Sequence, residues 1–166
     1  EAMIEQITKL VVESLQQYSD IQTKVPTGVS ARHIHLERQH LEQLFGKDYQ
    51  LTHFKPLSQP GQFAAEETVD LIGPKGTIAK VRILGPERPS TQVEVAMSDA
   101  RKLGMNPPVK TSGDIKGTPG ITIRGPKGVI TISEGVIISD RHIHMTPIEA
   151  KRFNVQKKKK VSFIAF

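Results

Sequence analysis

Four of the six histidines in this 166-residue chain lie in two copies of the tetrapeptide Arg-His-Ile-His. The first copy supplies His33 and His35, here called the first histidine pair, and the second supplies His142 and His144, the second histidine pair. Side chains alternate between the two faces of a β-strand, so the histidines of each copy are expected on one face. Neutral imidazole is a ligand of zinc and of its neighbours in the first transition row. Each copy therefore predicts half of a metal site.

A single His-x-His is more often a pair of surface histidines, because two imidazoles lack a third ligand. Here the pairs recur within matching octapeptides, residues 29–36 and 138–145, and this duplication favours metal binding. The third ligand should be a carboxylate or another histidine. Residues 91–96 alternate so that Gln92 and Glu94 share the polar face of an otherwise apolar strand, which makes them candidates for the site. A lone strand glutamate otherwise faces solvent more often.

The segment Gly-Pro-Glu-Arg-Pro at residues 85–89 is stiffened by two prolines and holds Arg88. A guanidinium fixed in place recognises phosphate through two parallel hydrogen bonds, which a mobile lysine does less well. Arg82 lies just upstream, and Lys75 lies in the turn before it. An arginine in a loop is usually solvated, but beside a histidine metal site it predicts a substrate that carries phosphate.

Several classes of chemistry lack their residues. The chain has no cysteine, so it has no disulfide, thiolate metal site or cysteine nucleophile. It also lacks Gly-x-Ser-x-Gly and His-Glu-x-x-His, the motifs of acyl-enzyme hydrolases and of common zinc proteases. Direct, metal-assisted group transfer remains.

The net charge of +6 comes from residues 151–166, which hold six lysine or arginine residues and no acid, while the charges of residues 1–150 balance. Only 5% of the residues are aromatic, so few side chains can stack on bases, and we expect no nucleic-acid partner. No apolar run reaches the roughly 20 residues that cross a bilayer, and none has the pattern of a signal peptide. We therefore expect a cytoplasmic protein without a membrane partner.

Residues 3–17 predict an amphipathic helix, because their apolar residues recur at helical spacing. Two interpretations are open: the helix packs on its own domain or on an oligomer partner, or it is a docking peptide for another protein surface. The apolar positions are Ile4, Ile7, Leu10, Val11 and Leu15.

After residue 24, short β-branched segments separated by glycine and proline predict strands. The tetrapeptide Gly-Pro-Lys-Gly occurs at residues 73–76 and 125–128, each time between two such segments, and predicts two hairpin turns. Neither copy is a phosphate-binding loop, which requires Gly-Lys-Ser or Gly-Lys-Thr. Short helices are predicted at residues 37–45, 98–103 and 146–153; glycines follow the first two, and a capping box opens the third.

These elements predict a mainly β fold with short helices, composed of two small β-barrel-like domains and an N-terminal amphipathic helix. Residues 1–24 would form the helix and a linker. Residues 25–110 would form the first barrel-like domain, with the first histidine pair and the arginine loop. Residues 111–166 would form the second.

In these motifs the sequence resembles the PduL-type phosphate propanoyltransferases (phosphotransacylases) of bacterial propanediol utilisation. The resemblance runs from about residue 25 to residue 153, through VPTGVSARHIHL, YQLTHFKPLSQPGQFAAEETVDLIGPKG, VRILGPERPSTQVEV, SGDIKGTPGITIRGPKG and GVIISDRHIHM. It implies a two-barrel zinc enzyme that interconverts a short-chain acyl-CoA, such as propanoyl-CoA, and phosphate with acyl phosphate and CoA.

The resemblance also implies roles for individual residues. Two zinc ions are expected, the first bound by His33, His35 and Glu94 and the second by His142 and His144. Arg88, as the phosphate-binding residue, and Glu94 would be catalytic. Coenzyme A would be held by Val29, Ser30, Ala31, Lys75 and Arg82.

Family members continue into a segment that supplies a third histidine to the second metal and closes the second barrel. We therefore expect the second domain of this chain to be incomplete at its C-terminus. The helix in residues 3–17 resembles the peptides that direct some family members into bacterial microcompartments. Shell or cargo proteins, or a second copy of the chain, are the expected partners, with the microcompartment lumen as an alternative location.

Two other functions remain open at this point. A metal-dependent thioester hydrolase would use water in place of phosphate as the nucleophile. A non-catalytic scaffold protein would use its histidine pairs to bind metal and stabilise the assembly of the two halves.

Overall fold

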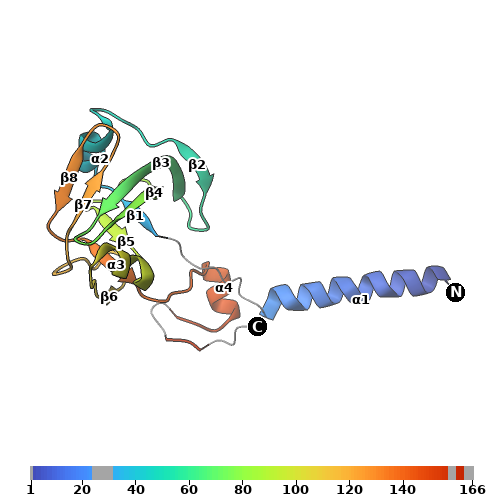
Figure 1. Ribbon diagram of the computed structural model, residues 1–166. Helices are drawn as coiled ribbons and strands as arrows, with labels where there is room; N and C mark the ends of the chain where they lie inside the picture. The colour runs from blue at the N-terminus through green and yellow to red at the C-terminus, as the bar shows by residue number, and fades with distance from the viewer. Residues whose placement is uncertain (1, 24–31, 157–159, 163–166) are drawn as a thin grey trace. The chain divides into compact units, whose positions relative to one another are not determined.

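The computed structural model describes residues 2–23, 32–156 and 160–162. The chain divides into two compact units, Glu1–Ser30 and Ala31–Phe166. The first unit contains the helix α1 (Ala2–Thr23) (Figure 1). The second contains the helices α2 (Arg38–Phe45), α3 (Met97–Leu103) and α4 (Pro147–Arg152), and the strands β1 (His33–His35), β2 (His53–Pro56), β3 (Phe63–Ile72), β4 (Thr77–Gly85), β5 (Gln92–Glu94), β6 (Val109–Lys110), β7 (Ile121–Arg124), β8 (Val129–Ile132) and β9 (Val136–Ser139).

The strands of the second unit form one curled sheet with the order β6-β9-β5-β1-β4-β3-β7-β8, and β2 pairs with β3 at its side (Figure 1). The mainly β fold with short helices and an N-terminal helix is confirmed. The two barrel-like domains are not confirmed, because β3 pairs with β7 and β5 pairs with β9 across the expected boundary. A division between residues 110 and 111 stays a prediction.

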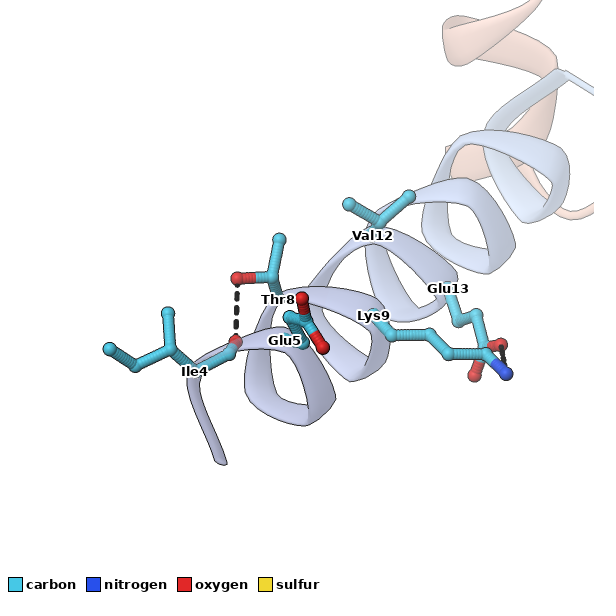
Figure 2. A pocket seen from close by; sticks show the side chains of 6 residues that line it. All are labelled: Ile4, Glu5, Thr8, Lys9, Val12 and Glu13. Atoms are coloured by element: carbon cyan, nitrogen blue, oxygen red, sulfur yellow. Dashed lines mark hydrogen bonds and ion pairs between the residues drawn. The ribbon is translucent and has the colours of Figure 1, made fainter. Parts of the chain in front are cut away.

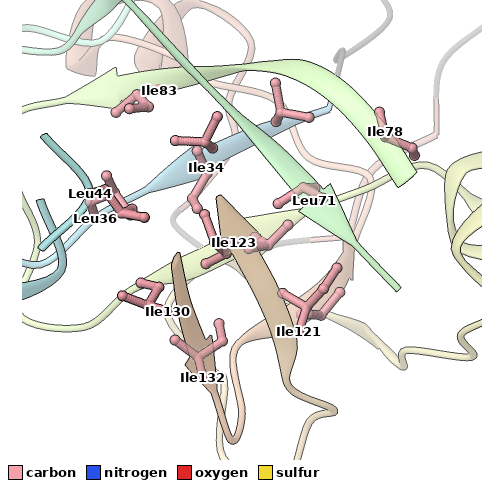
Figure 3. Packing of buried hydrophobic residues seen from close by; sticks show 14 of the residues in the cluster. Ile34, Leu36, Leu44, Leu71, Ile78, Ile83, Ile121, Ile123, Ile130 and Ile132 are labelled. Carbon is pink, nitrogen blue, oxygen red and sulfur yellow. The ribbon is translucent and has the colours of Figure 1, made fainter. Parts of the chain in front are cut away.

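The core of the sheet is built from aliphatic side chains that point to one side of the strands. Ile34 of β1, Ile83 of β4 and Ile123 of β7 are fully buried and lie in the same cluster (Figure 3). Burial of this apolar area is the main force that holds the curled sheet together. Because Ile34 points into the core, the alternation along β1 leaves its two flanking residues on the other face.

Both Gly-Pro-Lys-Gly turns form as predicted, and each one packs on the end of a helix. The backbone N–H of Lys75 donates to Leu103 O at the end of α3, at 3.0 Å, and that of Lys127 donates to Leu44 O in α2, at 2.9 Å. A Cβ atom at Gly125 would lie 2.7 Å from the same Leu44 oxygen. Glycine is therefore required there for the turn to approach the helix so closely.

The short helices also agree with their sequence signals. Gly46 follows α2, and Gly104 ends α3 in the left-handed region at φ 76°. In α4, Glu149 N donates to Thr146 Oγ1 at 3.2 Å, and Thr146 N donates to Glu149 Oε2 at 2.7 Å, which completes the capping box.

The second Arg-His-Ile-His copy does not form the strand that the sequence predicts, and this prediction is corrected here. Strand β9 ends at Ser139, and residues 140–146 belong to no strand or helix. The pairing of β9 with β5 covers only Val136 and Ile137, and its pairing with β6 ends at Ser139. Since the partner strands are short, no ladder continues to the second histidine pair.

The helix predicted in residues 3–17 is longer than expected and forms α1. Its apolar residues are exposed, with Ile4 at 70% and Leu15 at 63%. Figure 2 shows Ile4, Thr8 and Val12 along one side of α1, beside the Lys9–Glu13 ion pair of 4.0 Å. These side chains line an open depression on the helix surface. Among the described residues, no helix has the length and apolar character that crossing a membrane requires.

Candidate functional site

The first histidine pair and Glu94 meet on two neighbouring strands. His33 and His35 lie on β1 with ring centroids 5.2 Å apart and ring planes at 88°. The antiparallel register of β1 with β5 places Glu94 opposite His33. One ligand atom from each of the three residues lies within 4.8 Å of the other two. The register of one strand pair thus assembles the expected third ligand beside the histidines.

The donor set fits zinc. Two imidazoles and one carboxylate, with an open fourth position, are typical of catalytic zinc sites. His33 Nε2 and Glu94 Oε2 are 3.6 Å apart, against about 3.4 Å for two ligands of one tetrahedral zinc. His35 Nδ1 donates to Leu84 O at 3.3 Å, which leaves His35 Nε2 for the metal. A hydrogen bond of this kind orients the ring of a zinc-binding histidine.

The protonation states of the cluster also suit a cation. Burial, together with the positive charges of Arg88 and His33, lowers the pKa of His35 to about 4, so this imidazole is neutral at pH 7. Burial alone would raise the pKa of Glu94, but hydrogen bonding to His33 and to Ser112 outweighs it and lowers this pKa to about 2. The site therefore presents a neutral imidazole beside a carboxylate that stays ionised.

Arg88 lies next to this cluster, in the loop between β4 and β5. The guanidinium is half-buried, and its Nη1 donates to Ser112 Oγ at 3.1 Å. The backbone N–H of Arg88 donates to Leu36 O at 2.9 Å, which ties the loop to the residue after β1. Burial lowers the pKa of Arg88, and the charge of Glu94 opposes that effect. A guanidinium whose position is fixed by these hydrogen bonds can bind an anion beside the candidate metal ligands.

The second histidine pair is solvent-exposed, unlike the first. Its rings are in edge contact with centroids 4.7 Å apart, and His142 Nδ1 donates to Asp140 O at 2.7 Å. Burial and the charge of His142 lower the pKa of His144, and the charge of Glu94 acts in the opposite direction. Within residues 32–156 and 160–162, the only group of three metal-ligating side chains is the one around the first pair. The second pair has no third protein ligand there.

Of the five residues expected to hold coenzyme A, the structure describes two, Arg82 and Lys75. Arg82 is in register with His33, but its Nη1 donates to Ala65 O at 2.9 Å and to Glu66 O at 2.6 Å. Lys75 is exposed in the β3–β4 turn, at the opposite end of β4 from the Arg88 loop. Val29, Ser30 and Ala31 lie outside the described residues. Binding of coenzyme A by these five residues stays a prediction.

Sequence reasoning missed the residue that joins the arginine to the cluster. Ser112 comes from the glycine- and proline-rich stretch between α3 and β7, and its hydroxyl accepts hydrogen bonds from Arg88 and from Gln92. No spacing in the sequence connects residue 112 to residues 88 and 92, because the contact depends on how the loop folds back over β5. Gln92 itself stands out in the sequence as a polar residue in an apolar strand.

A family model described as phosphate propanoyltransferase matches residues 26–165. The chain belongs to the phosphate propanoyltransferase family. It is 50% identical to a phosphate propanoyltransferase of Thermotoga maritima over 95% of this chain and 77% of that one. A phosphate propanoyltransferase of Alkaliphilus metalliredigens is 48% identical over 94% and 74% of the two chains, and one of Enterococcus faecalis is 49% identical over 90% and 70%.

Membership of the phosphate propanoyltransferase family identifies the chain as a transferase. Both the cluster around the first histidine pair and the Arg88 loop lie inside the matched residues. The family resemblance inferred from the motifs is therefore confirmed over most of the chain.

Proposed function

We propose that this protein transfers a short acyl group, propanoyl in the first instance, between coenzyme A and inorganic phosphate. The name of the family and of its relatives supports the substrates. The observation that carries the proposal is the half-buried Arg88, hydrogen-bonded to Ser112 beside His33, His35 and Glu94. A candidate cation site close to an anion-binding guanidinium suits a reaction between a phosphate and a thioester.

We assign zinc to the cluster, bound by His33, His35 and Glu94. When bound, zinc supplies a Lewis acid that polarises an oxygen and stabilises negative charge. Glu94 stays ionised because of its lowered pKa, and His35 stays neutral because of its own. Both states are those that ligand binding requires. A second zinc at His142 and His144 is part of the proposal, and its third ligand is not among the described residues.

Arg88 would orient phosphate for attack on the thioester. A phosphate oxygen forms a bond to the carbonyl carbon, the carbon–sulfur bond breaks, and the sulfur leaves with the electron pair as the thiolate of coenzyme A. The guanidinium neutralises part of the phosphate charge, so the two anionic substrates can approach each other. Burial of Arg88 strengthens this effect, because its charge is less screened than at the surface.

The test is phosphate-dependent release of coenzyme A from propanoyl-CoA, measured by thiol detection before chelation, after chelation and after return of zinc. We expect release only with phosphate present, lost with the chelator and restored by zinc. Thiol release at the same rate with and without phosphate identifies a thioester hydrolase. Chelation that lowers the melting temperature of a protein without any activity identifies the scaffold alternative.

Substitution of the arginine separates transfer from hydrolysis. For Arg88→Ala we expect phosphate-dependent turnover to fall by about 100-fold or more, because a charged hydrogen bond to the substrate is lost in a partly buried site. Arg101→Ala is the matched control: Arg101 is an exposed arginine on α3, and its loss should leave turnover unchanged. An Arg88→Ala enzyme with wild-type turnover would exclude the proposed role.

We also propose that α1 docks on a partner protein, with a microcompartment shell as the first candidate. Exposure of Ile7 at 54% and Leu10 at 58% supports this assignment, because an amphipathic helix gains stability by burying such residues. Removal of residues 1–17, or Leu10→Glu alone, should abolish co-sedimentation with shells. Gln6→Glu adds the same charge at an exposed polar position and should have no effect. Unchanged co-sedimentation after the deletion would leave self-packing as the role of α1.

A further inference from the structure

The buried amide of Gln92 has a complete set of hydrogen bonds beside the cluster. Its side chain is 2% exposed. Nε2 donates to Glu94 Oε1 at 2.6 Å and to Ser112 Oγ at 2.9 Å, and Oε1 accepts from Gly113 N at 2.6 Å. Both amide hydrogens and the amide oxygen are used. A polar side chain buried in an apolar strand is stable only when satisfied in this way.

The chemistry of the neighbours fixes which way the amide faces. Gly113 N can only donate, so the amide oxygen must face it, and the amide NH₂ on the other side then faces Glu94 Oε1. With Oε1 of Glu94 occupied by Gln92, Oε2 is the oxygen that faces His33, at 3.6 Å. Gln92 therefore determines which carboxylate oxygen is presented to a cation.

The same amide is connected to the arginine. Ser112 Oγ accepts from Gln92 Nε2 and from Arg88 Nη1, at 2.9 and 3.1 Å. A continuous path of hydrogen bonds thus runs from Glu94 through Gln92 and Ser112 to Arg88. Groups joined by short hydrogen bonds lose freedom to move independently, and this matters where two charged groups must act on one reaction.

We propose that Gln92 is a positioning residue that sets the cation-binding carboxylate of Glu94 and the anion-binding guanidinium of Arg88 at a fixed separation. The effect of Gln92 on phosphate binding through Arg88 rests on the proposed function. Its effect on cation binding through Glu94 rests only on the set of metal-ligating side chains. Gln92 acts through Glu94 and, by way of Ser112, through Arg88.

The test compares Gln92→Met with Val93→Ala. Methionine keeps the length and approximate volume of glutamine but can neither donate to Glu94 nor accept from Gly113 in the same way. Val93 is a fully buried core residue on the same strand, so its truncation lowers stability without changing the hydrogen-bond path. Each variant is measured in the whole chain for zinc affinity, by competition with a chromophoric chelator, and for kcat and the KM for phosphate.

For Gln92→Met we expect zinc affinity to fall by about 10- to 100-fold, the usual effect of losing a partner of a metal ligand. The KM for phosphate should rise about ten-fold, the equivalent of one hydrogen bond to a charged group. Val93→Ala should keep both quantities near the wild-type values. Ser112→Ala keeps the Gln92–Glu94 bond but removes the hydroxyl that bonds Arg88 and Glu94. It should raise the KM for phosphate and lower zinc affinity less than Gln92→Met does, and it tests the path if Gln92→Met fails to fold.

The outcomes distinguish this inference from the proposed function. Wild-type zinc affinity and wild-type KM for phosphate in Gln92→Met would overturn the inference, as would equal losses in Val93→Ala. If the wild-type chain releases coenzyme A without phosphate, the proposed function fails, but the zinc measurement still decides whether Gln92 positions Glu94.

Discussion

Histidines of the same local sequence have different environments in the two Arg-His-Ile-His copies. His35 is 2% exposed with a pKa of about 4, whereas His144 is exposed. The arginine at the start of each copy also has a different environment. Arg32 and Arg141 are both exposed, but Arg32 forms an ion pair of 2.8 Å with Asp99 of α3, whose side chain is 7% exposed. Burial and charge pairing, more than residue type, therefore distinguish the two copies.

Glu67 is another buried carboxylate, outside the cluster, and its role is structural. Tyr49 Oη donates to Glu67 Oε1 at 3.0 Å, and Thr52 N donates to the same oxygen at 3.0 Å. Burial alone would raise the pKa of Glu67, but the hydrogen bonds from Thr52 and Tyr49 outweigh it and lower this pKa. The ionised carboxylate therefore stabilises the join between β3 and the segment before β2.

For Glu67→Gln we expect the free energy of unfolding at pH 7 to fall by about 1 to 3 kcal/mol, because a charge-assisted acceptor is replaced by a neutral one. The folded pKa lies below the unfolded value of about 4.3, so the contribution is fully present above that pH and is lost as the pH falls through the folded pKa. Denaturant titrations of both proteins from pH 7 to pH 3 measure the difference, which should shrink below about pH 4.3. Glu66→Gln, at the exposed neighbour, should change little at any pH. A constant difference across this range would contradict the assignment.

At the scale of elements, the two Gly-Pro-Lys-Gly turns act as matching contacts between hairpins and helices. The β3–β4 turn meets the end of α3, and the β7–β8 turn meets the end of α2. Each lysine side chain lies over the glycine that ends its helix, Lys75 by Gly104 and Lys127 by Gly46. A positive side chain near a helix C-terminus is favourable, since the last carbonyls carry partial negative charge. This contact gives Lys75 a structural role, independent of any ligand.

Gly125→Ala tests the fit between turn and helix. The added Cβ would lie 2.7 Å from Leu44 O and 2.8 Å from Leu44 Cβ, so the turn must move and the bond from Lys127 N to Leu44 O must weaken. We expect a loss of about 1 to 3 kcal/mol in the free energy of unfolding, measured by denaturant titration. Ser133→Ala, in an exposed turn after β8, is the control and should change stability by less than about 0.5 kcal/mol. A Gly125→Ala protein as stable as this control would show that the contact is loose.

At the scale of the second unit, the candidate metal ligands lie on two strands near the middle of one sheet. β1 lies between β5 and β4, and β5 pairs on its other side with β9. A cation bound by His33 and Glu94 would link neighbouring strands that are joined along the chain only through about sixty residues. Metal binding at this place should therefore stabilise the whole sheet rather than one loop.

We expect zinc to raise the melting temperature by about 5 to 10 °C when its free concentration is about 100 times the dissociation constant. Calorimetry or circular dichroism at increasing zinc concentration gives the shift. In Glu94→Gln the shift should be strongly reduced, because a neutral amide is a poorer ligand than a carboxylate. Glu66→Gln should keep the full shift. If zinc does not change the melting temperature of the wild-type protein, the proposed zinc site is wrong.

Local patterns in the sequence determined most of the elements and part of the site. The helix ends were predicted from Gly46, Gly104 and the Thr146–Glu149 capping box, and both hairpins were predicted from Gly-Pro-Lys-Gly. These predictions succeed because caps and turns depend on a few adjacent residues. Alternation along β1 and β5 placed His33, His35 and Glu94 as candidates. The duplicated motifs also led to the correct family.

Only the tertiary structure decided how these elements join. The pairing of β3 with β7 merges both halves into one sheet, and the short partners of β9 leave the second histidine pair outside any strand. Ser112 reaches Arg88 and Gln92 from twenty or more residues away. Such contacts depend on strand order and loop path, which involve residues far apart in the chain, and local periodicity carries no information about them.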